Sequence, residues 1–300
     1  MSEKLPLYGG QAVIEGVMMR GSKGLAIAMR APNKEIVVHS EPLSNIYKSR
    51  IIKIPFLRGI IALWDALGLG TRALTISANI QTGEDEKLEG PVLYLTLAIS
   101  LALGIGLFFL LPAAIGQLSE KYINLTSWWS NLLEGLVRLA LLVGYIWIIG
   151  RTPDIKRVFS YHGAEHKTIN AFEAGANLEP ETVSKYSIEH PRCGTAFLLT
   201  LVLTSVLIFS ILGPLPTVWR LVSRILLIPV LAGIAYEYIR WTANHLNSRF
   251  VRAIIKPNLA LQHLTTRQPS LDMLEVSIAA FNSMRSQELT STLKNSQLTV

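Results

Sequence analysis

The sequence has few charged residues and almost no cysteine. Charged residues make up 16% of the 300 residues and hydrophobic residues 50%, and the mean hydropathy is +0.37. This composition is atypical of an ordinary soluble domain and indicates insertion into a membrane. The single cysteine, Cys193, excludes a disulfide within the chain and fits a reducing cytoplasm. Cys193 is therefore expected to be a free thiol or a metal ligand.

The N-terminal end lacks the apolar core of a signal peptide. MSEKLPLYGG is polar, and the first long apolar run begins only near residue 91. We therefore expect the N-terminus to stay in the cytoplasm.

Four long apolar runs are present, each close to the roughly 20 residues that a helix needs to cross a bilayer. They lie at about 92–115, 132–149, 196–218 and 222–240. The second run contains Glu134 and Arg138, which can pair because they lie four residues apart on one helix face. The last two runs are separated by a Gly-Pro-Leu-Pro turn and are expected to form a helical hairpin.

The distribution of positive charge predicts the orientation of these spans. Of the 28 Lys and Arg residues, 24 lie before the first span, between the second and third spans, or in the tail when Arg240 at the end of the fourth run is counted with it, with 11, 6 and 7 in these regions. The bias places those three regions in the cytoplasm of a multi-pass cell-membrane protein. Topology and anionic headgroups explain the net charge of +7 better than nucleic acid does, although RNA stays as a weak alternative.

The predicted fold is an α-helical membrane protein with about four transmembrane helices and a small antiparallel β unit. Alternating apolar residues and turn signals predict a three-stranded meander over 8–40. Residues 51–78 are expected to form an amphipathic helix at the membrane interface, with a re-entrant or spanning segment as the alternative. A helix from Ser270 to about Met284 is predicted in the cytoplasmic tail.

These features divide the chain into six segments. In order they are a β unit (1–50), an interfacial helix and linker (51–90), transmembrane helices one and two (91–150), a cytoplasmic His/Cys loop (151–195), transmembrane helices three and four (196–241) and a cytoplasmic tail (242–300).

The stretch YHGAEHK contains the most specific candidate site. In a helix, His162, Glu165 and His166 project from one face, and two histidines four residues apart can chelate one zinc ion. HxxEH is also the motif of inverted zincins. The alternative is that both histidines only cap the helix or form hydrogen bonds near the membrane.

A second segment of the same loop favours metal. His190 and Cys193 add an imidazole and the only thiol of the chain, the two groups that zinc prefers. Four ligands would make a closed, structural site, whereas three would leave a position open for water. Glu165 would then be the general base, or a carboxylate that orients a ligand. The expected cofactor is a divalent metal, most simply zinc.

Two further carboxylates have alternative interpretations. Glu237, near the end of the fourth span, is a candidate metal ligand or proton acceptor; the simpler interpretation is an ion pair with Arg240. Glu15 is interpreted as a residue on the solvated face of a strand, with a position beside the metal loop as the alternative.

The blocks GGQAVIEGVMMRG, HGAEHKTINAFE, HPRCGTAF, YEYIR, LQHLTTRQP and LEVSIAA lie between about residues 5 and 282. With them the chain closely resembles the bacterial membrane proteins of domain-of-unknown-function family 1385. The resemblance implies a multipass membrane protein described as a predicted metal-dependent enzyme, and it supports a metal at His162, Glu165, His166, His190 and Cys193. It implies no particular reaction, and the likeness to inverted zincins is confined to the motif.

Three functions are compatible with these patterns. The first is a metal-dependent hydrolase at the cytoplasmic membrane face, acting on a membrane-associated substrate. The second is a scaffold or assembly factor with a structural zinc site, which would bind a partner protein. The third is a transporter, which the small number of polar groups within the spans disfavours. The lipid bilayer is the expected partner in all three, and the sequence does not predict an oligomeric state.

Overall fold

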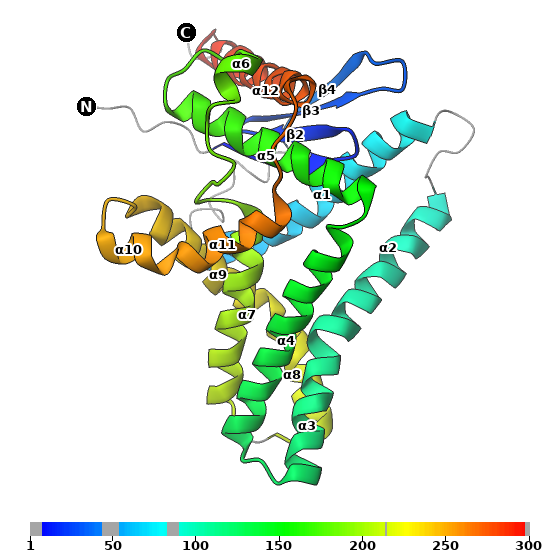
Figure 1. Ribbon diagram of the computed structural model, residues 1–300, viewed down its shortest axis with the longest axis vertical. Helices are drawn as coiled ribbons and strands as arrows, with labels where there is room; N and C mark the ends of the chain where they lie inside the picture. The colour runs from blue at the N-terminus through cyan, green and yellow to red at the C-terminus, as the bar shows by residue number, and fades with distance from the viewer. Residues whose placement is uncertain (1–7, 44–53, 83–89, 214, 298–300) are drawn as a thin grey trace.

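The computed structural model describes residues 8–43, 54–82, 90–213 and 215–297 (Figure 1). Residues 51–53 of the predicted interfacial helix, most of the predicted linker at 81–90, and Pro214 of the predicted turn lie outside these ranges. The described chain has two parts: a small sheet covered by helices at one end, and a bundle of apolar helices extending away from it.

The sheet has four antiparallel strands in the order β1-β2-β3-β4. Their bounds are Gly9–Val13, Gly16–Arg20, Gly24–Arg30 and Ile36–Pro42. The prediction of three strands was wrong, because the first predicted strand folds back at Ile14 and Glu15. Val13 pairs with Gly16 across this two-residue turn, and Glu15 adopts a positive φ of 54°. Apolar Ile14 concealed the turn, since tight hairpin turns usually contain Asn or Gly.

One face of the sheet packs on α1 (Leu57–Thr82). Side chains from its second half, including Ala73 and Leu69, contact the buried strand residues Val13, Leu25 and Ile27. The helix is long and apolar enough to cross a membrane. Its second half nevertheless forms a protein layer beneath the sheet.

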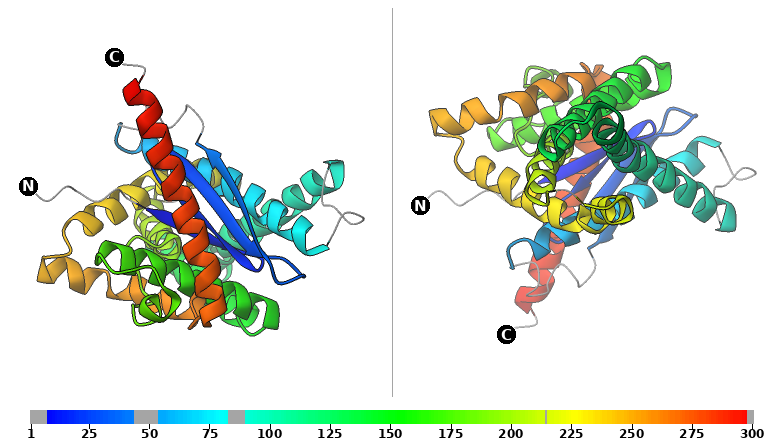
Figure 2. Two further views of the ribbon diagram at one scale, coloured as in Figure 1. Left: turned by 90° about the horizontal axis from the view of Figure 1, so that it is seen from above. Right: turned by 90° about the horizontal axis from the view of Figure 1, so that it is seen from below.

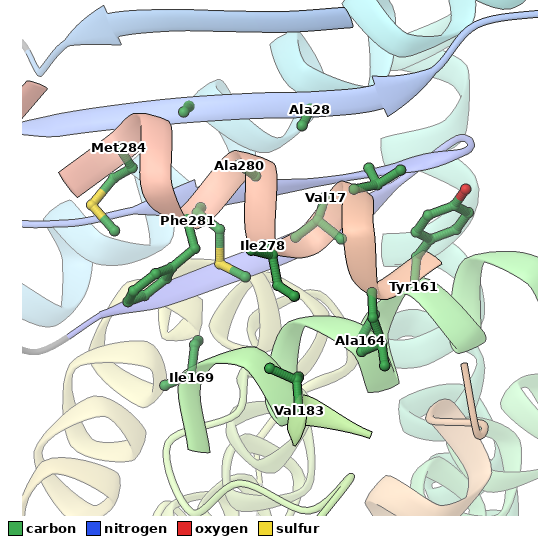
Figure 3. Packing of buried hydrophobic residues seen from close by; sticks show 14 of the residues in the cluster. Val17, Ala28, Tyr161, Ala164, Ile169, Val183, Ile278, Ala280, Phe281 and Met284 are labelled. Carbon is green, nitrogen blue, oxygen red and sulfur yellow. The ribbon is translucent and has the colours of Figure 1, made fainter. Parts of the chain in front are cut away.

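The opposite face is covered by α5 (Pro153–Glu173) and α12 (Leu271–Gln297), with the short α6 (Pro180–Val183) beside them. Figure 2 shows α12 running diagonally across the strands. The apolar residues of this core interlock between the two helices and the sheet, as Phe281, Tyr161 and Val17 do in Figure 3. The tail helix extends well beyond Met284. Glu288, in its added turns, accepts hydrogen bonds from the backbone N–H groups of the β2–β3 turn.

The bundle contains a helix interrupted by a π-helical turn, two continuous helices, and a broken pair. In order they are α2 (Gly90–Ile105), η3 (Gly106–Leu110) and α3 (Leu111–Ile123), then α4 (Ser127–Ile149), α7 (Gly194–Ile211), α8 (Thr217–Leu226) and α9 (Ile228–Asn244). Among the described residues, four helices are long and apolar enough to cross a membrane: α1, the run from Gly90 to Ile123, α4 and α7.

The fourth predicted span is broken. Helices α8 and α9 are bent by 44° relative to each other, and together they would make a fifth crossing segment. Pro229 lies in the first turn of α9, where its missing N–H and its ring prevent α8 from continuing. After α9, α10 (Arg249–Ile254) and α11 (Lys256–Thr265) lead the chain back to α5 and α12.

Candidate metal centre

Three of the predicted ligands lie together. The donor atoms of His162, His166 and Cys193 are all within 4.8 Å of one another. Both histidines are on α5, whose helical spacing puts their ring centroids 4.4 Å apart. Cys193 immediately precedes α7 and caps it, because its sulfur accepts a hydrogen bond from the N–H of Thr195. The Sγ of Cys193 lies 3.2 Å from Nε2 of His162.

The imidazole rings are held by backbone carbonyls. Nδ1 of His162 donates to the carbonyl of Thr265 at 2.9 Å, and Nδ1 of His166 donates to that of Ile188 at 2.5 Å. Because each neutral ring has one N–H, this assignment leaves a lone pair on both Nε2 atoms. Nε2 of His166 is buried and has no hydrogen-bond partner among the described residues. A ring such as that of His166, fixed through one nitrogen and unpaired at the other, is typical of a metal ligand.

His190 lies at the edge of this cluster rather than within it. Its ring centroid is 5.7 Å from that of His166, and it is not part of the three-residue group. The side chain of Gln262 fixes its backbone through two hydrogen bonds, of 3.0 and 2.9 Å. Nε2 of His190 faces the carboxylate of Glu173 at 3.7 Å. Burial lowers the pKa of His190 below its usual value despite that carboxylate.

Glu165 is buried on the same helix, with 5% of its surface exposed. Its carboxyl group packs against Gly10 of β1 so closely that a Cβ on Gly10 would lie 2.9 Å from its Cγ. Burial raises the pKa of Glu165 to about 7, although the nearby His162 and a hydrogen bond from the Gly10 backbone act in the opposite direction. A carboxyl group with this pKa can both accept and release a proton near neutral pH.

Glu237 lies elsewhere, so the structure does not support its assignment as a ligand. Both oxygens of its carboxylate accept hydrogen bonds from Arg58 at the start of α1, and one of them also accepts from the N–H of Phe56. The partner is thus Arg58 rather than the expected Arg240. The pair joins α9 to α1, a contact between segments that are about 180 residues apart and that no local pattern indicates.

Glu15 also has a structural partner. Its carboxylate forms a bidentate ion pair with Arg157, and Tyr161 donates a hydrogen bond to it at 3.3 Å. Both partners lie on α5, within five residues before His162. Glu15 therefore attaches the β1–β2 turn to the helix that carries the histidines, and the structure places it with Arg157 rather than with the cluster.

Sequence reasoning missed the groups that orient the rings. The carbonyls of Thr265 and Ile188 are backbone atoms, so no residue type identifies them. Gln262 did have a signal, because it belongs to the LQHLTTRQP block, which the structure brings beside the His/Cys loop.

Comparison with known proteins agrees with the resemblance noted in the sequence. The family described as "Protein of unknown function (DUF1385)" matches residues 54–287. The "Uncharacterized protein YqhQ" of Bacillus subtilis (strain 168) is 36% identical over 294 residues, which cover 93% of this chain and 92% of that protein. No solved structure matches. The chain belongs to the DUF1385 family.

Proposed function

We propose that the chain is an integral membrane protein whose sheet and candidate metal centre lie at the cytoplasmic surface. All six tryptophans have side chains at least 44% exposed. On α4, Trp129 and Trp147 are 18 residues apart, which in an α-helix is about 27 Å. This distance approaches the roughly 30 Å of a hydrocarbon core, and tryptophan is enriched at both of its boundaries. The positive-charge bias supports the orientation.

The donor set favours zinc as the bound metal. Two imidazole nitrogens and a thiol are borderline-soft ligands that suit zinc better than magnesium or calcium. The unpaired Nε2 of His166 supports this assignment, because a buried lone pair without a partner is unfavourable unless something binds it. His162, His166 and Cys193 would hold the ion, and His190 is near enough to His166 to join them after a small movement.

The activity that this geometry supports best is metal-dependent hydrolysis of a membrane-associated substrate. The observation that carries this proposal is the buried carboxyl group of Glu165, one residue from His166 and with a pKa near 7. A structural site does not need such a group, and burying it is unfavourable. A bound zinc ion supplies Lewis acidity and makes water more acidic. Glu165 would take up the proton and return it to the leaving group.

A structural zinc site in a scaffold is the second candidate, and burial favours it. His166 and Cys193 are 1% and 5% exposed, and His190 is 3% exposed. The cluster also joins three separate parts of the chain, namely α5, the segment before α7 and the end of α11. Joining distant segments is the usual task of a closed zinc site.

The two candidates predict different effects of Glu165→Gln and His166→Ala. Full-length protein is purified in detergent, and its metal content and thermal unfolding midpoint are measured. The membranes of a deletion strain carrying each variant are compared by mass spectrometry of lipids and peptides. For hydrolysis, Glu165→Gln keeps the metal but slows turnover about 10²- to 10⁴-fold, so the same species accumulates as in the deletion strain.

Matched controls are available on the same surface. Glu181→Gln removes an exposed carboxylate and His263→Ala an exposed imidazole, and neither change should alter metal content. If His166→Ala unfolds the protein while Glu165→Gln leaves the membranes unchanged, the scaffold is correct. Wild-type protein without stoichiometric transition metal would contradict both.

A further inference from the structure

Three arginines meet around one glutamate inside the helical bundle. Glu134 accepts hydrogen bonds from Arg138 and Arg224 at 2.8 to 2.9 Å, and from Arg220 at 3.3 Å. None of the four is more than 3% exposed. We call these four residues the arginine cluster. The sequence predicted only the pair of Glu134 and Arg138. Arg220 and Arg224 both lie on α8.

The helices around the cluster are interrupted. Nε of Arg138 donates at 2.7 Å to the carbonyl of Phe108, which belongs to the π-helical turn η3. Arg220 and Arg224 are on α8, the short half of the broken helix pair. In membrane proteins, discontinuous helices that meet at ionisable side chains commonly form ligand sites.

The cluster spans the outer half of the proposed membrane. The hydroxyl of Ser130 accepts from Arg220 at 2.8 Å, and Ser130 directly follows Trp129. Arg138 is nine residues beyond Trp129, or about 14 Å along α4, roughly midway to Trp147. Figure 1 shows α8 and α3 at the end of the bundle away from the sheet. The cluster therefore runs from the outer boundary to the middle of the bilayer.

The positive-inside rule does not explain the three arginines of the cluster. Four Lys and Arg residues lie outside the three regions assigned to the cytoplasm: Lys121, Arg138, Arg220 and Arg224. The positive-inside rule accounts for the other 24 and disfavours cations near the outer face. Three of the four exceptions meet in the arginine cluster, so a local function has to account for them.

The charges of the cluster do not balance. Among the residues that the structure describes, one more carboxylate besides Glu134 contacts it: Glu120, which accepts from Nη1 of Arg220 at 3.0 Å and is 27% exposed. Three guanidinium groups against two carboxylates leave one positive charge. Uncompensated charge is costly in an apolar environment. A singly charged anion would remove this cost.

Arg220 provides the available donor. Its Nε is buried and has no hydrogen-bond partner in the described part of the chain. Its guanidinium group is accommodated by Gly116 of α3, where a Cβ would lie 2.8 Å from Nη2. The partly exposed Glu120 marks the side on which the guanidinium group is closest to the surface.

We propose that the arginine cluster binds a singly charged phosphate oxyanion, with Arg220 as the first contact and the phosphate group of an outer-leaflet lipid as its source. Planar guanidinium groups suit phosphate oxygens because they donate two parallel hydrogen bonds. The unpaired Nε of Arg220 donates to the phosphate, and the carboxylate of Glu120 on the same guanidinium group opposes the ligand by charge repulsion. The inference rests on the proposed membrane placement and is independent of the metal centre.

The test uses full-length protein in detergent with water-dispersible probes. The thermal unfolding midpoint is followed against the concentration of dioctanoyl phosphatidylglycerol, of dioctanoylglycerol, which lacks the phosphate, and of inorganic phosphate. Wild-type protein is expected to bind the phosphate-bearing lipid at least about tenfold more tightly than dioctanoylglycerol. Arg220→Gln should abolish most of this preference, because hydrogen bonds to charged groups are worth about a factor of ten or more.

Two further variants make the test specific. Glu120→Gln removes the opposing carboxylate and should tighten binding, which a variant that is merely damaged would not do. Lys121→Gln removes the neighbouring exposed cation and should leave binding unchanged. If inorganic phosphate binds as tightly as the lipid, the source is the soluble anion. Equal affinities for both lipids, or an unchanged preference in Arg220→Gln, would show that the cluster is only paired internally and would overturn the proposal.

The membrane placement is checked separately, by retention of the chain in membranes after an alkaline wash. Release by the wash would refute the placement, whereas retention together with equal lipid affinities would refute the phosphate site alone.

Discussion

The two buried polar clusters of this protein differ in what they leave unsatisfied. In the candidate metal centre, backbone carbonyls take up the N–H groups of His162 and His166, and nitrogen lone pairs remain. In the arginine cluster, a carboxylate is surrounded by donors, and an N–H group and a positive charge remain. The first arrangement is complementary to a cation and the second to an anion. The comparison teaches that the groups left over after internal pairing indicate a ligand better than the residue types alone.

Glu134→Gln tests the arginine cluster and should have the largest effect on stability. It removes the one fully buried carboxylate among three guanidinium groups. Removing one partner of a buried pair typically costs about 3–5 kcal/mol. The unfolding midpoint in detergent measures this, with Glu120→Gln as the control. Because Glu120 is 27% exposed, its change should stay below about 1 kcal/mol. Equal effects would mean that burial does not distinguish the two carboxylates.

The pH dependence of the stability of metal-free protein tests the candidate metal centre. Burial raises the folded-state pKa of Glu165 to about 7 from its ordinary value of 4.5, so the folded state holds this proton more tightly than the unfolded state does. Its contribution to stability is complete below pH 4.5 and is lost as the pH rises through 7, by about 3 kcal/mol in total.

Denaturant unfolding of chelator-treated protein between pH 5 and 8 measures the slope of the free energy of unfolding against pH. Glu165→Gln should flatten it, because the glutamine does not titrate, and Glu181→Gln should leave it intact. An unchanged slope in Glu165→Gln would show that the carboxyl group is solvated, and the contrast between the two clusters would weaken.

Gly10→Ala probes the contact between the sheet and the candidate metal centre, with a smaller effect. The added methyl group would lie 2.5 Å from the carbonyl oxygen of Met18 and 2.9 Å from Cγ of Glu165. Such overpacking typically costs about 1–3 kcal/mol. Gly9→Ala is the matched control, since a Cβ there meets nothing within 4 Å. Thermal unfolding of the pair compares them, and indistinguishable midpoints would mean that Glu165 can move away from β1.

The sequence predicted the parts of the candidate site that depend on local spacing. The positions of His162, Glu165 and His166 follow from the helical repeat, and Cys193 was identified because it is the only thiol. The partner of Glu237 was missed because Arg58 is 179 residues away in the chain. Periodicity indicates which face a residue occupies, but not which other helix that face meets.

The fold was predicted where hydrophobic runs are long and missed where a run hides a break. The apolar runs in α4 and α7 are well defined in sequence, whereas Ile14 hid a hairpin turn and Pro229 was placed inside a span. Arg220 and Arg224 had an available signal. They lie four residues apart, while Val218, Trp219 and Leu226 are exposed on the other side of α8. Reading that ten-residue segment as an amphipathic helix would have predicted that both arginines face the bundle.

Helix α4 carries Arg138 and Glu134, helix α5 carries His162 and His166, and only residues 150–152 separate them. So short a link allows little independent movement, and the backbone N–H groups of all three of its residues donate hydrogen bonds to the last turn of α4. A movement of α4 is therefore expected to be passed on directly to α5. A rotation of α4 about its axis would move the imidazoles of α5 relative to the thiol of Cys193, so a change at the arginine cluster would alter the spacing of the donor atoms in the candidate metal centre.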